Sequence, residues 1–249
     1  MATKTKIAIL QMGLAACLIA GGVGCNKGEE QVSPAGAVEP SRGGGTATGA
    51  AGNVAGSYTI TSAANPGGGG GYQGSVSITP AGDIYKIAWT IPNSPPYSGV
   101  AILEGATLGV GWGMGAQYGV AVYTINGGKL TGRWATASSG TTAGTEVIEG
   151  PEGLSGTYKV VSAKAPAGGS YTGTVTITPT GATHSVQWNL SNGSFSGVGI
   201  RQGNLLIVGW GESGKGAGAV SYQVSGTSLT GVWATPGGTQ LGSETITRR

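Results

Sequence analysis

YTGTVTITPTGATHSVQW, residues 171–188, decides the fold, because the same pattern already occurs at residues 72–89 as YQGSVSITPAGDIYKIAW. In both stretches apolar or aromatic residues alternate with polar ones, and this period of two is typical of a β-strand with one buried face. The proline and glycine in the middle favour a tight turn, since proline presets φ and glycine accepts a positive φ. Each stretch therefore predicts a β-hairpin whose buried face includes a tryptophan on the second arm, Trp89 or Trp188.

The chain from Gly56 onward repeats itself about one hundred residues later, so that Gly-Ser-Tyr at 56–58 returns as Gly-Thr-Tyr at 156–158. All six tryptophans pair off between the copies. The spacing changes only in segments rich in Gly, Pro or Ser, which indicates surface turns. The repeat therefore predicts two modules, residues 55–150 and 151–249, joined by the Gly- and Pro-containing segment at 150–155.

Each copy contains eight short segments with strand patterns. In the second copy they lie near 157–163, 170–178, 183–190, 195–202, 204–211, 218–225, 228–235 and 242–248. The connections are too short for helical crossovers, so neighbouring strands must pair antiparallel. The predicted fold class is all-β, with two tandem eight-stranded antiparallel meander modules. Each module closes into a small barrel or forms a two-layer sandwich, and closure would leave no free edge.

The predicted inward face of the first copy consists of alternating large side chains. These are Tyr58, Ile60, Tyr72, Val76, Ile78, Tyr85, Ile87, Trp89, Val100, Ile102, Leu108, Val110, Trp112, Tyr123, Ile125, Leu130, Trp134 and Ile148.

The composition excludes several classes of function. Charged residues make up 9% of the chain and the formal net charge is +3, so nothing indicates nucleic acid as a partner. Both cysteines, Cys17 and Cys25, lie near the N-terminus, and His184 is the single histidine. The folded part therefore lacks the residues for a thiolate zinc site or a repeated histidine-based triad. We expect no cofactor, no metal and no catalytic residues.

Residues 1–24 resemble a bacterial lipoprotein leader, because Lys4 and Lys6 precede an apolar run that ends in small residues. In such leaders a cysteine after a small-residue box carries the lipid. Cys25 closes the full apolar run and is followed by polar residues, so we expect palmitate and the anchor there. Cys17 is the alternative, since the preceding Leu-Ala-Ala matches the box better. A cleaved secretory leader and an uncleaved anchor helix remain open.

Residues 25–54 are rich in Gly, Ala, Ser, Glu and Pro and show no period, which is typical of a flexible tether. Leader and tether together predict an exported protein of the bacterial cell envelope. A lipid would anchor it to the membrane, on the periplasmic or the outer-membrane face.

Glu146 and Glu244 are the only carboxylates present in both copies. Each lies two residues before an isoleucine, Ile148 or Ile246, so each is expected to point inward or toward a rim. A structural role predicts an acid that accepts hydrogen bonds from a tyrosine hydroxyl or a tryptophan indole. A binding role predicts a polar anchor for a ligand in the barrel mouth. Each copy has one shared acid, whereas a glycosidase needs two carboxylates about 5 to 10 Å apart.

The other candidate residues are aromatic. The tryptophans lie on the apolar faces of different strands, where core packing is the default, although their rings could also stack on a sugar or a peptide. They are Trp89, Trp112 and Trp134 in the first copy and Trp188, Trp210 and Trp233 in the second. His184 takes the position of Tyr85, so we expect it in an aromatic core or rim role.

The spaced motifs Gly-x-Tyr, Tyr-x-Gly-x-Val-x-Ile-Thr-Pro-x-Gly, Gly-Trp-Gly and Leu-Thr-Gly-x-Trp resemble a short β module of bacterial envelope proteins, some of them labelled fibronectin-binding. The resemblance covers residues 56–149 and 156–248. It implies an exported adhesion or structural module and supplies no catalytic residues. The eight-stranded meander is also similar to avidin-like and lipocalin-like barrels in outline, without their ligand-site motifs.

These observations rank three hypotheses. The first is a lipid-anchored, non-enzymatic envelope protein with a structural or adhesion-type binding role, whose partner is an envelope or extracellular protein or a glycan. The second is a β-barrel that binds a small apolar ligand or a glycan, and it requires a cavity beside Trp89, Trp112 and Trp134. The third and weakest is a hydrolase.

Overall fold

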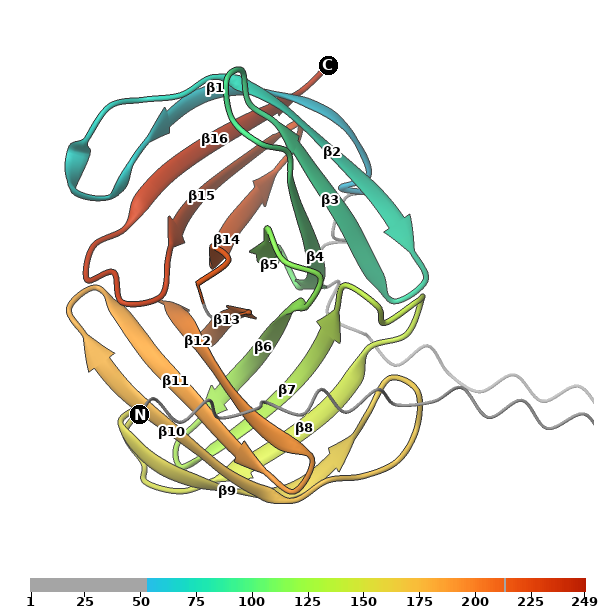
Figure 1. Cartoon of the computed structure of the whole chain (residues 1–249), viewed down its shortest axis with the longest axis vertical. Helices are drawn as coiled ribbons and strands as arrows, with labels where there is room; N and C mark the ends of the chain where they lie inside the picture. The colour runs from blue at the N-terminus through green and yellow to red at the C-terminus, as the bar shows by residue number, and fades with distance from the viewer. Residues whose placement is uncertain (1–52, 213) are drawn as a thin grey trace, which may run out of the picture. The chain divides into compact units, whose positions relative to one another are not determined.

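The computed structural model describes residues 53–212 and 214–249. Its strands close into two eight-stranded antiparallel barrels (Figure 1). The predicted fold class is confirmed, and of the two predicted architectures the chain adopts the barrel. The predicted signal peptide, Cys17, Cys25 and most of the tether lie outside the described residues. Within the described residues, no helix has the length and apolar character needed to cross a membrane.

One barrel takes its strands from both ends of the described chain and is here called the split barrel. Its strands are β1 (Gly56–Ala64), β2 (Gly74–Ala81), β3 (Ile84–Thr90), β4 (Tyr97–Glu104), β5 (Thr107–Gly113), β14 (Ala217–Ser225), β15 (Ser228–Ala234) and β16 (Gly242–Arg248). A short 3-10 helix, η1 (Pro66–Gly68), follows β1.

The other barrel is one uninterrupted stretch of chain and is here called the continuous barrel. Its strands are β6 (Tyr118–Asn126), β7 (Lys129–Thr136), β8 (Gly144–Glu149), β9 (Gly156–Lys164), β10 (Gly173–Thr180), β11 (Thr183–Leu190), β12 (Gly193–Gln202) and β13 (Leu205–Gly211). In Figure 1 the blue to green strands β1–β5 lie together with the red strands β14–β16 in the split barrel, and strands β6–β13 form the continuous one.

This partition differs from the predicted modules 55–150 and 151–249. Each barrel contains five strands of one sequence copy and three of the other, because β5 pairs with β14 and β13 pairs with β6. The segment 150–155, predicted as a linker, instead joins β8 to β9, which are paired neighbours in the continuous barrel. The strands themselves lie close to their predicted positions. The copies have therefore exchanged their last three strands.

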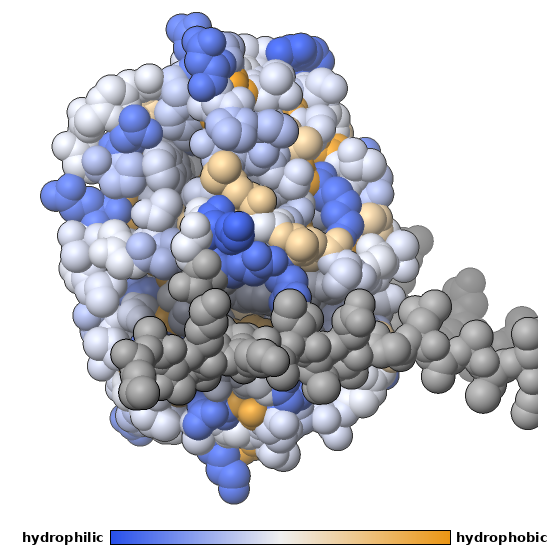
Figure 2. Space-filling view, viewed as in Figure 1, coloured by the Kyte–Doolittle hydropathy of each residue, from blue (hydrophilic) through white to orange (hydrophobic). Residues whose placement is uncertain are grey.

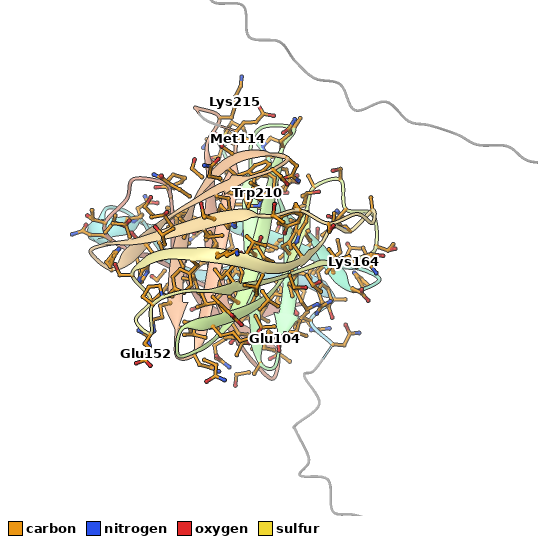
Figure 3. The ribbon with its side chains drawn as sticks, turned by 90° about the horizontal axis from the view of Figure 1, so that it is seen from below. Glu104, Met114, Glu152, Lys164, Trp210 and Lys215 are labelled. Carbon is orange, nitrogen blue, oxygen red and sulfur yellow. The ribbon has the colours of Figure 1, made fainter. Side chains whose placement is uncertain are left out.

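The exchange takes place at two short crossovers, residues 114–117 and the segment between β13 and β14. The crossovers are hydrogen-bonded to each other: Met114 N–H donates to the Gly216 carbonyl at 3.0 Å, and Glu212 N–H donates to the Gln117 carbonyl at 3.1 Å. The Glu212 carboxylate also accepts the backbone N–H groups of Ala116 and Gln117, both at 3.1 Å. Met114 and Lys215 mark this end of the barrels in Figure 3.

The two predicted hairpins have the expected register, with Val76 opposite Trp89 and Val175 opposite Trp188. Their turns use glycine in the left-handed region, with φ of 60° at Gly82 and 81° at Gly181. Both tips also contact the opposite barrel. The N–H next to each glycine donates to a loop carbonyl there: Asp83 to Thr141 at 2.8 Å and Ala182 to Thr239 at 2.9 Å.

Two apolar clusters between the barrels account for the strands that do not alternate. One joins β3 and β4 of the split barrel to β6, β7 and β13 of the continuous barrel; the other joins β12 to β14 and β15. Val100 and Ile102, predicted to face inward, lie in the first cluster, and Ala101 faces the interior instead. The prediction failed here because β4 is buried on both faces. On the face shown in Figure 2, hydrophobic residues form only small separate patches.

The barrel ends away from the crossovers are closed by the segments that precede β1 and β9. Val54 packs into the split-barrel core, and the Tyr58 hydroxyl donates to its carbonyl at 2.7 Å. Leu154 packs against the continuous-barrel core, and the Tyr158 hydroxyl donates to the Pro151 carbonyl at 3.2 Å. With one end of each barrel plugged in this way, the interior is reached from the crossover end.

Candidate functional site

The predicted acids and tryptophans gather in two pockets, one in each barrel. The split-barrel pocket has a volume of about 250 Å³ and is lined by Asn65, Tyr72, Trp89, Ile91, Ser94, Tyr97, Trp112, Val220, Trp233 and Glu244. The continuous-barrel pocket has a volume of about 200 Å³ and is lined by Ala121, Tyr123, Trp134, Thr136, Glu146, Tyr171, Trp188, Leu190, Asn192, Phe195 and Trp210. Of the predicted site residues, His184 alone lines neither pocket.

Glu244 is the buried acid of the split-barrel pocket, with 3% of its surface exposed. It lies on β16 at an inward position, as its spacing from Ile246 predicts. Its Oε1 accepts the indole N–H of Trp89 at 3.1 Å and the hydroxyl of Tyr222. An indole N–H can only donate, so Oε1 must be an acceptor. These partners are the ones that the structural interpretation of this acid predicts.

Glu146 repeats this arrangement in the continuous barrel, where it lies on β8 and is 2% exposed. Its Oε1 accepts the hydroxyl of Tyr123 and the indole N–H of Trp188, the latter at 3.3 Å. The same indole is 3.3 Å from the Tyr123 hydroxyl oxygen. The carboxylates at equivalent positions of the two sequence copies thus share one hydrogen-bonding pattern, each in a different barrel.

Burial and the carboxylates keep the surrounding tyrosines neutral. Burial first, and then the charge of Glu244, raise the pKa of Tyr222 well above its ordinary value. The same two causes act on Tyr123 beside Glu146. They also raise the pKa of Tyr72 and of Tyr171 in the respective pockets. These hydroxyls therefore hold their protons at physiological pH and act as donors toward the acids.

Edge-to-face ring pairs form the aromatic walls. In the split barrel, Tyr97 meets Trp112 with ring centroids 5.5 Å apart at 90°, and Tyr72 meets Trp233 at 6.4 Å and 68°. The continuous barrel has pairs at the equivalent positions: Phe195 meets Trp210 at 5.4 Å in a tilted arrangement of 58°, and Tyr171 meets Trp134 edge-to-face at 6.0 Å and 70°. Edge-to-face pairs are a favoured arrangement of aromatic rings.

Four of the wall tryptophans lie against glycines: Trp112 against Gly218, Trp210 against Gly119, Trp134 against Gly144 and Trp233 against Gly242. A Cβ atom at Gly144 would come within 2.7 Å of Trp134 Nε1, and one at Gly242 would overlap Trp233 Nε1. Glycine is therefore required at both positions for the indole to lie flat on the strand. Both indole N–H groups are buried and have no hydrogen-bond partner among the described residues.

Each pocket is assembled from both sequence copies. In the split barrel, Trp89 and Trp112 come from the first copy, whereas Trp233 and Glu244 come from the second. The continuous barrel has the reciprocal composition. Trp112 is the next-to-last residue of β5 and lies directly beside the crossover at residues 114–117. Neither copy alone therefore supplies a complete pocket of this construction.

His184 lies on β11 away from the pocket, at the end where β11 begins. Burial first, and then the positive charge of Arg201, lower the pKa of its imidazole. Its Nδ1 is buried without a hydrogen-bond partner among the residues described. His184 lies opposite Gly199 on β12, and a Cβ atom at Gly199 would be 3.3 Å from the His184 Cβ.

Sequence reasoning placed the acids and tryptophans in the site but treated the tyrosines as core residues only. Tyr72 and Tyr123 were predicted to face inward, without a role in a pocket. The signal was present, because Tyr72 returns as Tyr171 and Tyr123 as Tyr222 in the second copy, just as the tryptophans do. Tyr97, the first residue of β4, and Phe195, the third residue of β12, were not among the predicted pocket residues.

The described residues contain no cluster of three or more His, Cys, Asp or Glu side chains that could hold a metal ion. Comparison of the chain with protein-family models, with curated proteins and with solved structures found no match.

Proposed function

We propose that the protein is a non-enzymatic binding protein that holds one small ligand in each barrel. The observation that carries this proposal is the pair of equivalent cavities, about 250 and 200 Å³, each beside a buried glutamate. Protein interiors normally leave few voids larger than a water molecule, so equivalent cavities at equivalent places are unlike packing defects. For comparison, an apolar cavity of roughly 150 Å³ holds benzene.

The lining describes the kind of ligand. Most of the wall is aromatic or aliphatic. The polar groups are the glutamate and the tyrosine hydroxyls, together with Asn65 and Ser94 in the split barrel or Thr136 and Asn192 in the continuous one. Binding sites for small molecules commonly combine an apolar wall with a few fixed polar groups. The pockets therefore suit a compact, largely apolar ligand with one polar group that meets the carboxylate.

The predicted leader gives this function a location. Lipidation at Cys25, with Cys17 as the alternative, would anchor the barrels to a membrane of the cell envelope through the tether at 25–54. Incorporation of labelled palmitate that is lost in Cys25→Ser and kept in Cys17→Ser would support this placement. Loss only in Cys17→Ser would show that Cys17 is the lipidated residue. No incorporation in the unmutated protein would contradict the lipid anchor.

Binding can be tested by tryptophan fluorescence, because all six tryptophans line the two pockets. A panel of small amines, mono- and disaccharides and aromatic alcohols should contain a compound that shifts the emission and binds with two sites per chain. Val220→Phe and Ala121→Phe fill equivalent positions in the two pockets, so each should reduce the number of sites to one. A ligand that still binds when both substitutions are combined would place binding elsewhere and contradict the proposal.

A further inference from the structure

Neither pocket glutamate has a cationic partner among the described residues. The one ion pair among the described residues joins Lys129 and Glu149 at 3.0 Å, and both side chains are half-exposed at the surface. No lysine, arginine or histidine lines either pocket. Charged groups are rarely buried without a partner, because removal from water is costly for an isolated charge. Each pocket thus contains a negative charge that no described side chain neutralises.

All donors to each glutamate are neutral side chains, and the closest of them reach the same oxygen, Oε1. Trp89 and Tyr222 both donate to Oε1 of Glu244, and the equivalent pair in the other barrel donates to Oε1 of Glu146. The hydroxyls of Tyr72 and Tyr171, which also line the pockets, act as further donors toward Glu244 and Glu146 respectively. A ligand in either cavity therefore meets the carboxylate beside a tyrosine hydroxyl.

The aromatic walls favour a cation with an apolar surface. The faces of aromatic rings carry partial negative charge, and cages of tryptophan and tyrosine are the usual recognition element for quaternary ammonium groups. Five rings line the split-barrel pocket and six line the other. Tyr97 in one barrel is replaced by Phe195 in the other, so the shared requirement is the ring face and not its hydroxyl. A hydrated metal ion would find one carboxylate and no other oxygen cluster.

We infer that each pocket binds a small organic cation, an alkylated ammonium group whose charge lies against Glu244 or Glu146 and whose alkyl groups contact the surrounding rings. This inference rests on the proposed binding function and names the class of its ligand. A neutral sugar would leave the carboxylate without a counter-charge, and most of its hydroxyls would face aromatic carbon. The compact cavities suit a group of the size of trimethylammonium with a short substituent.

The decisive comparison uses two probes of the same shape on the unmutated full chain. Choline carries a quaternary nitrogen, and 3,3-dimethyl-1-butanol has carbon in its place and no charge. Isothermal titration should show choline binding at two sites per chain, at least tenfold more tightly than the neutral probe. Equal binding of the two probes, or no binding of choline at millimolar concentration, would overturn the inference.

Charge-removing variants test the same point within the protein. Glu244→Gln and Glu146→Gln keep an acceptor oxygen for the tryptophan and tyrosine donors but remove the charge. Each should weaken choline binding in its own barrel at least tenfold and leave the neutral probe unchanged. Unaltered choline binding in both variants would overturn the inference.

Further arms separate this inference from the proposed function. Suppose that choline does not bind but a neutral compound does, and that Val220→Phe or Ala121→Phe abolishes its binding. The inference of a cationic ligand would then be wrong, whereas the proposed binding function of the pockets would stand. If choline still binds when Val220→Phe and Ala121→Phe are combined, binding does not take place in the pockets, and the proposed function is contradicted as well. Vesicles of phosphatidylcholine serve as a second source of the same head group. Competition by vesicles at matched head-group concentration would assign the site to a membrane lipid, and its absence to a free ammonium compound.

Discussion

In the split barrel the pocket carboxylate comes from β16, the last strand of the chain, whereas in the continuous barrel it comes from β8, near the middle. The tryptophan that donates to it comes from β3 in one barrel and β11 in the other. The pockets nevertheless have the same hydrogen bonds and the same ring pairs. Each pocket is therefore defined by the spatial arrangement of eight strands, and the order in which the chain supplies those strands is secondary.

The largest difference between the barrels should appear on truncation. Removal of residues 217–249 deletes three strands of the split barrel and none of the continuous barrel. We expect the shortened chain to lose the split barrel and to retain one folded barrel with one ligand site. Far-UV circular dichroism, urea unfolding and titration would measure this.

A second fragment, 151–249, contains eight strands, five from the continuous barrel and three from the split barrel, and it should form neither barrel in the observed arrangement. If it yields a complete pocket while the truncated chain yields none, the strand exchange does not occur in solution.

The next largest effect concerns the buried acids. Glu244→Ala and Glu146→Ala each leave a tyrosine hydroxyl and an indole N–H without an acceptor, at a cost of about 2 to 4 kcal/mol in the free energy of unfolding. The loss should be confined to the barrel that carries the substitution. Urea unfolding without ligand would measure it, with the corresponding Gln variants as controls of smaller effect. A loss below 1 kcal/mol would show that these hydrogen bonds do not hold the barrels together.

The interface between the barrels can be weakened symmetrically. A Cβ atom at Gly111 would overlap the Gly119 carbonyl, and one at Gly209 the Gly218 carbonyl, in both cases across the two barrels. Gly111→Ala and Gly209→Ala should each cost about 1 to 3 kcal/mol, since the backbones must move apart. Gly153→Ala is the control, because nothing lies within 4 Å of the added atom. Equal stability of all three variants would contradict the close approach.

Alkaline pH should affect both barrels alike. The pKa of Tyr123 and that of Tyr222 are raised by burial and by the adjacent glutamate, so the folded state keeps protons that the unfolded state releases above about pH 10. Stability is therefore fully present below pH 10 and falls above it, by about 1.4 kcal/mol per pH unit for each tyrosine. Tyr123→Phe and Tyr222→Phe should each flatten this slope. A stability that rises between pH 10 and 11 would contradict it.

The smallest effect should come from removing the one hydroxyl that distinguishes two equivalent wall rings, Tyr97 and Phe195. Tyr97→Phe gives the split barrel the ring that Phe195 provides in the continuous barrel, and it removes a single hydroxyl. We expect the affinity for the ligand to change less than about threefold, within the usual range for substitutions that remove no buried contact. Titration of the variant would measure this change. A tenfold loss would mean that the hydroxyl contacts the ligand and that the two pockets differ in specificity.

Much of the local structure follows from the sequence, because the determinants lie close together in the chain. The alternation around Trp89 and Trp188 defines the hairpins, and the paired acids and tryptophans define the pockets. The partner of β5 could not be predicted in this way. The segments Tyr118–Tyr123 and Ala217–Tyr222 carry nearly the same pattern, so either one fits beside β5. The choice depends on contacts between the barrels, including those of Val100 and Ile102, which no local period reveals.

The pairing of β1 with β16 has a topological consequence. Tyr58 lies opposite Arg248, and the Arg249 N–H donates to the Ser57 carbonyl at 2.9 Å, so the two ends of the folded region adjoin. A short connection between these ends, combined with a cut at residues 114–117, gives a circular permutant whose chain runs through β6–β13 and then through β14–β16 and β1–β5. In that order each barrel is one unbroken segment and the chain passes between them once. Two adjacent barrels without strand exchange and the exchanged pair thus have the same arrangement of strands and differ only in where the chain begins and ends.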